Sequence, residues 1–173
     1  EKHVVDGNLP SLVSFEALMP SGKPPMVLKV EFSETVAVAS VDPTKYTLYA
    51  GANGNEVNVP LTDATSKAYA AGSTTTVLIQ VTATNLASLR SATGLVRAAD
   101  STFLKIAAEG VADNKGNKNI ETAAPLKQAT QYTMDITAPT LSQFDLDLDK
   151  NEITFRFNED VVLSTFDVTK ATL

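Results

Sequence analysis

The chain has 173 residues, a formal net charge of −6 and no cysteine. Without cysteine it cannot hold a disulfide framework, a zinc–thiolate site or a thiol nucleophile. Its acidic balance argues against nucleic acid, whose phosphates require basic clusters. No stretch approaches the roughly 18 apolar residues of a membrane-spanning helix, so we expect no membrane insertion.

Strand patterns dominate the chain. Residues 27–32 alternate apolar and charged side chains, which is typical of a half-buried strand, and residues 153–157 repeat that alternation. Pro60 predicts an edge strand at 57–61, because proline cannot donate to a strand ladder. The remaining strands are predicted, in chain order, at 12–15, 46–49, 74–81, 103–106 and 132–136.

One segment has helical character. Thr84 is a candidate N-cap for residues 84–91, and Leu86 and Leu89 lie three positions apart, as they would on one face of a helix. About seven strands with regular turn signals predict an all-β fold, an immunoglobulin-like β-sandwich with a short helical insertion. A small barrel is the alternative.

The beginning of the chain recurs near its end. Residues 32–48 align with 157–173 at a spacing of 125 positions (Phe32 to Phe157), and the upstream segments align at 129 (Asp6 to Asp135). The identical pairs of the longer match are Phe32 and Phe157, Glu34 and Glu159, Val36 and Val161, Asp42 and Asp167, Thr44 and Thr169, Lys45 and Lys170, Thr47 and Thr172, and Leu48 and Leu173. A chain that restarts its own pattern indicates a tandem array.

This repeat predicts the domain organisation. We expect residues 1–6 to be the last strand of a preceding repeat, 7–136 to be a complete immunoglobulin-like domain, and 137–173 to be the first strands of a following, incomplete repeat. Pro139 restricts the backbone at the boundary, so the short linker should hold adjacent units in a semi-rigid line. Two ways of completing this last unit stay open: the rest of its own sequence, or strands from adjacent subunits.

Three short motifs occur in a fixed order along the unit: FSETV at 32–36, DNKGN at 113–117 and DITAP at 135–139. In this order they resemble bacterial-type immunoglobulin-like tandem repeats of surface-layer proteins and giant adhesins, which also occur in microbial-eukaryote surface proteins. The unit is longer than is usual for that family, and the helical insertion around 84–98 accounts for part of the difference. The resemblance implies a stacked extracellular or cell-surface rod without catalytic activity.

The sequence offers no catalytic constellation. His3 is the single histidine, and nucleophilic catalysis needs a positioned base with its own orienting partner. We interpret His3 as an ordinary strand residue. The phosphate-binding and zinc-protease motifs GxxxxGK, GxGxxG and HExxH do not occur, so we expect a protein that is not an enzyme and has no organic cofactor.

Acidic residues alternate with leucines near the end of the chain. Asp145, Asp147 and Asp149 suggest a calcium loop, but the EF-hand pattern needs glycine at its sixth position and glutamate at its twelfth. Lys150 and Arg156 stand there instead. The alternation favours a strand with its aspartates on the wet face. Such a row of like charges is unfavourable unless a cation or a base neutralises it.

The candidate metal site is calcium at the junction of two repeats. Calcium takes six to eight oxygen ligands, and five residues are candidates: Asp113, Asn117, Asp135, Glu34 and Glu159. We expect the two glutamates to follow strands that end at one pole of the sandwich. The alternative, which turn chemistry favours, is that Asp113 and Asn117 cap a tight turn and that Glu34 bonds backbone amides at a sheet corner.

These observations favour a structural repeat of an extracellular filament, surface layer or cell-surface appendage. Its partners would be neighbouring repeats and copies of itself in a filament. An adhesin module that recognises glycan or protein is one alternative, although the chain has no tryptophan for a sugar platform. An accessory domain of a secreted hydrolase is the other.

Overall fold

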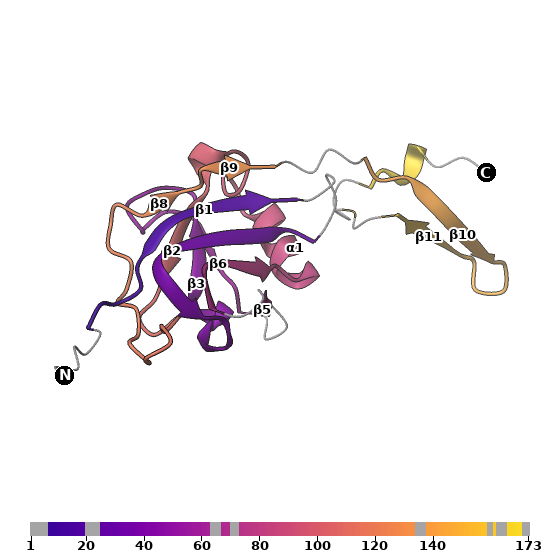
Figure 1. Ribbon diagram of the computed structural model, residues 1–173. Helices are drawn as coiled ribbons and strands as arrows, with labels where there is room; N and C mark the ends of the chain where they lie inside the picture. The colour runs from indigo at the N-terminus through magenta and orange to yellow at the C-terminus, as the bar shows by residue number, and fades with distance from the viewer. Residues whose placement is uncertain are drawn as a thin grey trace, which may run out of the picture. The chain divides into compact units, whose positions relative to one another are not determined.

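The computed structural model describes residues 7–19, 25–62, 67–69, 73–133, 138–158, 161 and 166–170 (Figure 1). The chain divides into two compact units, Glu1–Asp135 and Ile136–Leu173, called unit 1 and unit 2 below. The fold is rich in β-strands, and the described residues contain one α-helix. None of the helices in this part of the chain is long and apolar enough to cross a membrane.

Unit 1 contains a five-stranded sheet in the order β5-β6-β2-β1-β9. All neighbours are antiparallel except β1 and β9, which run parallel (Figure 1). The strands are β1 (Leu12–Leu18), β2 (Val27–Ala37), β5 (Lys67–Tyr69), β6 (Ser73–Gln80) and β9 (Gln131–Tyr132).

A second sheet in unit 1 has four antiparallel strands in the order β4-β3-β7-β8. They are β3 (Tyr46–Tyr49), β4 (Asn58–Pro60), β7 (Phe103–Ile106) and β8 (Lys127–Gln128). β4 lies at the edge, as Pro60 predicts. The sequence pattern missed β5 and β8, because strands of three and two residues are too short to show a period.

The two sheets share one hydrophobic core. Phe15 and Val30 of the five-stranded sheet and Leu48 and Leu104 of the four-stranded sheet are all fully buried in the same cluster. Each sheet thus turns its apolar alternate positions inward. The inner faces of the two sheets are buried against each other in this core, and this burial stabilises strands that are short by themselves.

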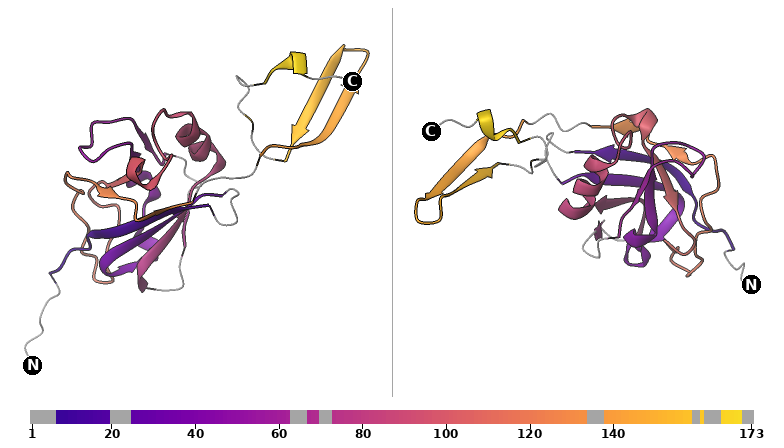
Figure 2. Two further views of the ribbon diagram at one scale, coloured as in Figure 1. Left: turned by 90° about the horizontal axis from the view of Figure 1, so that it is seen from above. Right: turned by 180° about the vertical axis from the view of Figure 1, so that it is seen from behind.

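The helix α1 (Ala83–Ser91) confirms the predicted helical segment. Its N-cap is Thr82 rather than Thr84: Thr82 has extended backbone and its hydroxyl accepts a hydrogen bond from the Asn85 amide at 3.3 Å. Leu86 and Leu89 are buried. Figure 2 shows α1 on one face of strands β1 and β2. Short 3₁₀ helices occupy Val38–Ser40 (η2), Pro43–Lys45 (η3), Ala99–Ser101 (η4) and Val168–Lys170 (η6).

Unit 2 is built around one antiparallel hairpin, β10 (Leu141–Asp147) with β11 (Glu152–Phe157). Residues 148–151 form its turn, where Asn151 adopts a φ of 55°. Asp149 therefore lies in the turn, and the expectation of one strand through all three aspartates was wrong for it. Three earlier predictions, for residues 1–6 with His3, for Asp135 and for Glu159, lie outside the described residues.

Candidate functional site: the apolar face of the β10–β11 hairpin

The hairpins β1–β2 and β10–β11 have the same strand register. In the first, Phe15 lies opposite Val30; in the second, Phe144 lies opposite Phe155. Both pairings also shift register at matching places, between Leu12 and Ser14 in β1 and between Leu141 and Gln143 in β10. The two stretches of similar sequence thus form the same local structure.

The hydrogen bonds that close the two hairpins also match. The Ser33 amide donates to the Ser11 carbonyl at 3.0 Å, and the Asn158 amide donates to the Thr140 carbonyl at 3.0 Å. In the return direction, the Ser11 amide bonds the Ser33 hydroxyl at 3.1 Å and the Thr140 amide bonds the Asn158 side chain at 2.6 Å. Side chains that differ chemically therefore make the same backbone closure.

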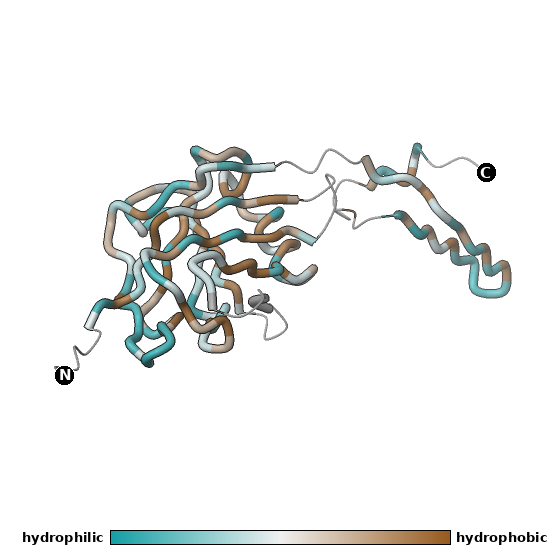
Figure 3. Tube along the Cα trace, viewed as in Figure 1, coloured by the Kyte–Doolittle hydropathy of each residue, from teal (hydrophilic) through white to brown (hydrophobic). Residues whose placement is uncertain are grey.

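Burial distinguishes the two hairpins. Phe15 and Val30 are 0 % exposed, whereas Phe144 is 51 % and Leu146 is 49 % exposed. Cross-strand pairing places Phe144, Leu146, Ile153 and Phe155 on one side of the hairpin; we call these four residues the hairpin face. Figure 3 shows the alternation of hydrophobic and hydrophilic positions along both strands. A face of this composition can pack against another apolar surface but cannot take part in proton transfer, because hydrocarbon side chains neither accept nor donate protons.

One further aromatic ring joins this face. Phe166, which is 44 % exposed, lies with its ring centroid 5.6 Å from that of Phe155, within the range of favourable aromatic pairs. The alternation of β10 marks Leu146 as a member of the face, two positions after Phe144. No periodic signal marks Phe166, which lies outside the strands, so only the structure could find it.

The opposite side of the hairpin is charged, and two of its carboxylates pair with basic side chains. The Arg156 Nε lies 3.3 Å from the Asp145 Oδ2, and the Lys150 Nζ lies 2.8 Å from the Asp147 Oδ2. The bond from Lys150, with the amides of Lys150 and Asp149, holds the pKa of Asp147 below its usual value. Two basic side chains thus do for Asp145 and Asp147 what a cation would otherwise have to do.

Asp113 and Asn117 lie together in a tight turn of unit 1. The Asp113 Oδ1 accepts from the amides of Lys115 and Asn117, both at 2.8 Å, and its Oδ2 accepts from the Asn117 side-chain amide at 2.8 Å. Burial raises the pKa of Asp113, but the bonds from Asn117 and from the turn amides outweigh it, so the net pKa lies below its usual value. The DNKGN motif forms the hydrogen-bonded turn that its residue types predict.

The other candidate metal ligands do not join this pair in the described structure. Glu34 lies inside β2, not after its end, because β2 continues to Ala37 through a register shift between Glu31 and Val36. Asp135 and Glu159 lie outside the described residues. Within the described ranges, no three His, Cys, Asp or Glu side chains form a group that could hold a metal ion.

The edges of the hairpin are as notable as its face. Among the described strands, β10 and β11 pair only with each other, so each has one edge without a partner strand in the described part of the chain. Unpaired strand edges are sites where another strand adds to a sheet.

Comparison of the chain with protein-family models, with curated proteins and with solved structures finds no match.

Proposed function

We propose that the chain is part of a tandem array of immunoglobulin-like β-sandwiches, with a non-catalytic structural role in an extracellular filament, surface layer or appendage. One observation carries this proposal. The second hairpin repeats the register and the bulge of the first, but leaves exposed the apolar face that the first hairpin buries.

The strand order supports the sandwich. Immunoglobulin-like sandwiches have strands A, B, E and D in one sheet and C, F and G in the other. If β1, β2 and β3 are strands A, B and C, and β5 to β8 are D to G, the observed orders β5-β6-β2-β1-β9 and β4-β3-β7-β8 contain D-E-B-A and C-F-G. β4 is then an additional edge strand beside C. β9 is a further strand, beside A.

The likeness between the units continues beyond the hairpins and supports the tandem repeat. The Asp42 Oδ1 accepts from the Thr44 amide at 3.0 Å and from its hydroxyl at 2.6 Å. The Asp167 Oδ1 accepts from the Thr169 amide and hydroxyl at the same distances. Both turns contain a short 3₁₀ helix, which in unit 1 leads directly into β3.

The exposed hairpin face supports a role in a larger assembly. An isolated two-stranded hairpin is marginally stable in water, and a sheet needs cover for its apolar face. In unit 1 that cover is a second sheet bearing Leu48 and Leu104. The hairpin face would take the same kind of cover, from the remainder of its own sandwich or from strands of another copy. Extracellular location rests on the resemblance of the three motifs to surface repeats.

A hybrid chain tests the proposal. In it, Lys170 is followed by residues 46–133 of the same sequence, which would supply strands C to G to the second hairpin. We expect the amides of 141–157 to become protected from hydrogen exchange and the binding of a hydrophobic dye to the hairpin face to fall. Hairpin amides that exchange as fast as in the original chain, while unit 1 stays folded, would contradict the equivalence of the two units.

The hybrid needs a control for side-chain volume. Leu146 and Phe155 occupy the positions of Ala17 and Val30 in the first hairpin, and overpacked cores are destabilised. A second hybrid with Leu146→Ala and Phe155→Val removes this obstacle. Failure of both hybrids to protect the hairpin would reject the tandem-sandwich proposal, because the second hybrid matches unit 1 at both positions where side-chain volume differs.

Calcium belongs to this proposal as its one candidate ion. A ligand that binds only the folded form raises the melting temperature. We expect a higher melting midpoint in calcium than in a chelator, and equal midpoints would remove calcium from the proposal.

A further inference from the structure

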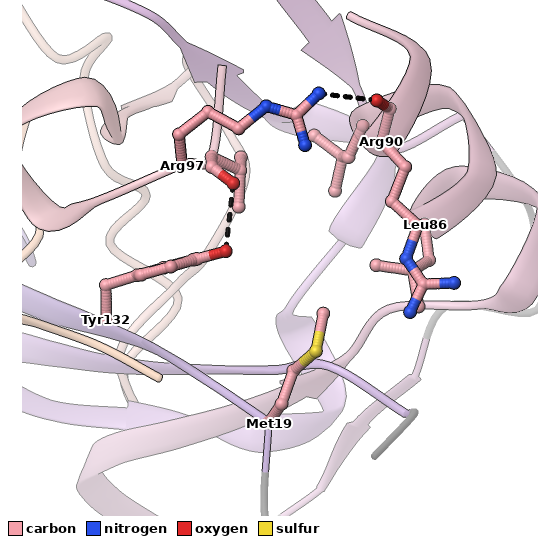
Figure 4. Close-up of a pocket in the computed structure, with 7 residues that line it drawn as sticks. Met19, Leu86, Arg90, Arg97 and Tyr132 are labelled. Atoms are coloured by element: carbon pink, nitrogen blue, oxygen red, sulfur yellow. Dashed lines mark hydrogen bonds between the residues drawn. The ribbon is translucent and has the colours of Figure 1, made fainter. Parts of the chain in front are cut away.

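Two loops of unit 1 are held in different ways. The segment after α1 is held through space: the Tyr132 hydroxyl of β9 donates to the Val96 carbonyl at 2.9 Å, beside a cavity of about 350 Å³ between α1 and β9 (Figure 4). In the loop between β3 and β4, residues 50–57, four hydrogen bonds instead end on one of the loop's own side chains, the carboxylate of Glu56. The chemistry of this second loop depends on that carboxylate.

The Glu56 carboxylate bonds both residues of an Asn-Gly pair. Its Oε1 accepts from the Asn53 amide at 3.2 Å and from the Asn53 Nδ2 at 2.9 Å. Its Oε2 accepts from the Gly54 amide at 2.9 Å and from the Asn55 amide at 3.1 Å. Burial raises the pKa of Glu56, but the bonds from Asn53 and from the loop amides outweigh it, so the net pKa lies below its usual value. The side chain is therefore an anion at neutral pH.

Two glycines make this arrangement possible. Gly54 has a φ of 79°, in the left-handed region that glycine enters at little cost. A Cβ at Gly51 would lie 2.7 Å from the Cδ of Glu56, well inside the distance of normal carbon contacts. A larger residue at position 51 would thus displace Glu56 from the loop. The sequence GANGNE at 51–56 is built for this contact.

Asn53-Gly54 is the only Asn-Gly pair in the sequence, and such a pair has a reaction of its own. The Gly54 nitrogen attacks the Asn53 Cγ, and the new C–N bond closes a five-membered succinimide. The bond from Cγ to Nδ2 breaks, and the proton that the Gly54 nitrogen loses converts the leaving group into ammonia. Water then opens the ring at either carbonyl, which leaves aspartate or isoaspartate at position 53. Glycine favours the ring closure because it has no Cβ to obstruct it.

We infer that Asn53 is a site of spontaneous deamidation and that Glu56 holds it in an unreactive state. The attacking nitrogen must lose its proton, and a carboxylate bonded to that N–H opposes the loss, because two like charges would then face each other. The bond from the Asn53 Nδ2 also restrains the carboxamide, whose carbon must turn toward the Gly54 nitrogen. Asn53 is exposed, so water can reach it. This inference concerns one loop of unit 1 and does not rest on the proposed structural role.

Incubation of the complete chain at neutral pH tests the inference, with mass spectrometry of its peptides to measure aspartate and isoaspartate at position 53. Glu56→Gln removes the charge but keeps the length of the side chain. It should deamidate at least about fivefold faster, the factor that one net hydrogen bond represents. Glu109→Gln is the matched control, because it removes a carboxylate that pairs with Lys118 elsewhere on unit 1, and it should keep the original rate. A rate in Glu56→Gln equal to or below that of the original chain would overturn the inference.

Two measurements do not depend on the folding of the Glu56 variant. The original chain should deamidate at position 53 more slowly in native buffer than in guanidinium chloride; equal rates, or no reaction in the denaturant, would refute the inference. Asn53→Asp reproduces one product: it loses the Nδ2 donor and places a second carboxylate beside Glu56, where like charges repel. Its amides 53–55 should exchange hydrogen faster than those of the original chain, and unchanged exchange would show that Glu56 does not hold this loop.

Discussion

The two hairpins of this protein are a natural comparison of one local structure in two settings. β1–β2 and β10–β11 share strand register, bulge position and closing hydrogen bonds. They differ in what lies against them. In unit 1 a second sheet contributes Leu48 and Leu104 to the core that buries Phe15, whereas the equivalent Phe144 is half exposed.

This difference separates two causes of structure. Alternation of apolar and polar residues and a short connection are local, so they act alike in both hairpins. Burial requires contacts from residues that are distant in the chain, and it contributes most of the stability of a folded domain. The comparison therefore predicts unequal consequences for equal substitutions at matched positions.

The largest effect is expected for matched phenylalanines. Phe15→Ala removes a fully buried ring and should lower the unfolding free energy of unit 1 by about 3–5 kcal/mol. Phe144→Ala should cost under about 1 kcal/mol, because substitutions at exposed positions have small effects. Urea denaturation of both variants measures the difference. Equal losses would mean that the hairpin face is covered in solution, and the comparison would fail.

Two asparagines, one in each unit, should differ in the same direction. Asn119 is buried, and its side chain accepts from the Val111 amide at 2.9 Å and donates to the carbonyls of Ala107 and Ile120. Asn119→Ala leaves these groups unpaired and should cost unit 1 about 2–3 kcal/mol. Asn158→Ala removes an exposed bond of the hairpin and should leave the denaturation midpoint of unit 1 in place. A similar loss from both variants would contradict this expectation.

Two tyrosines of unit 1 should give effects of opposite sign. The Tyr46 hydroxyl is buried and has no hydrogen-bond partner among the described residues, and the matching position in the similar sequence of 157–173 is Ala171. Tyr46→Phe should raise the unfolding free energy by about 1 kcal/mol, whereas Tyr132→Phe, which loses the bond to Val96, should lower it by about as much. Denaturation midpoints distinguish the two signs, and a destabilising Tyr46→Phe would disprove the unpaired hydroxyl.

Because Tyr46 is buried, we also expect the protein to lose stability at high pH. Burial, helped by the nearby charge of Asp42, raises the pKa of Tyr46 far above its usual value. A group whose folded pKa is raised contributes stability below its unfolded pKa, about 10 for tyrosine, and that stability is lost as the pH rises beyond it. Tyr46→Phe should therefore flatten the decline of the melting midpoint above about pH 10.

The smallest effect is expected for acid titration of the two capped turns. The pKa values of Asp113 and Asp147 are both lowered by hydrogen bonds in the fold. Each carboxylate thus contributes stability above its unfolded pKa, about 4, which is lost as the pH falls through the folded value. Asp113→Asn should reduce the acid sensitivity of the unit 1 melting midpoint, and Asp147→Asn should not. An equal response to both would mean that the hairpin and unit 1 unfold together.

Much of the fold is predictable from residue patterns. Strand-like residue patterns located β1, β2, β3, β6 and β7, Pro60 placed β4 at an edge, and the leucine spacing located α1. β5 and β8 were missed because their pairing partners, not their own residues, make them strands. The prediction that Glu34 follows the end of a strand was wrong. A register shift extends β2 beyond Glu34, and this shift depends on contacts of β2 with β6 and with the Asp113 turn, which are distant in the chain.

The candidate site likewise has one part that the sequence predicts and another that it does not. The alternating residues of 141–157 by themselves determine a hairpin with one apolar side, because the two-residue period of a strand is a property of the backbone. The addition of Phe166 to that side, the pairing of Lys150 and Arg156 with the aspartates, and the cavity between α1 and β9 were decided only by tertiary structure. Each of these features brings together residues whose spacing in the sequence shows no periodic pattern. Such contacts form only when the chain folds.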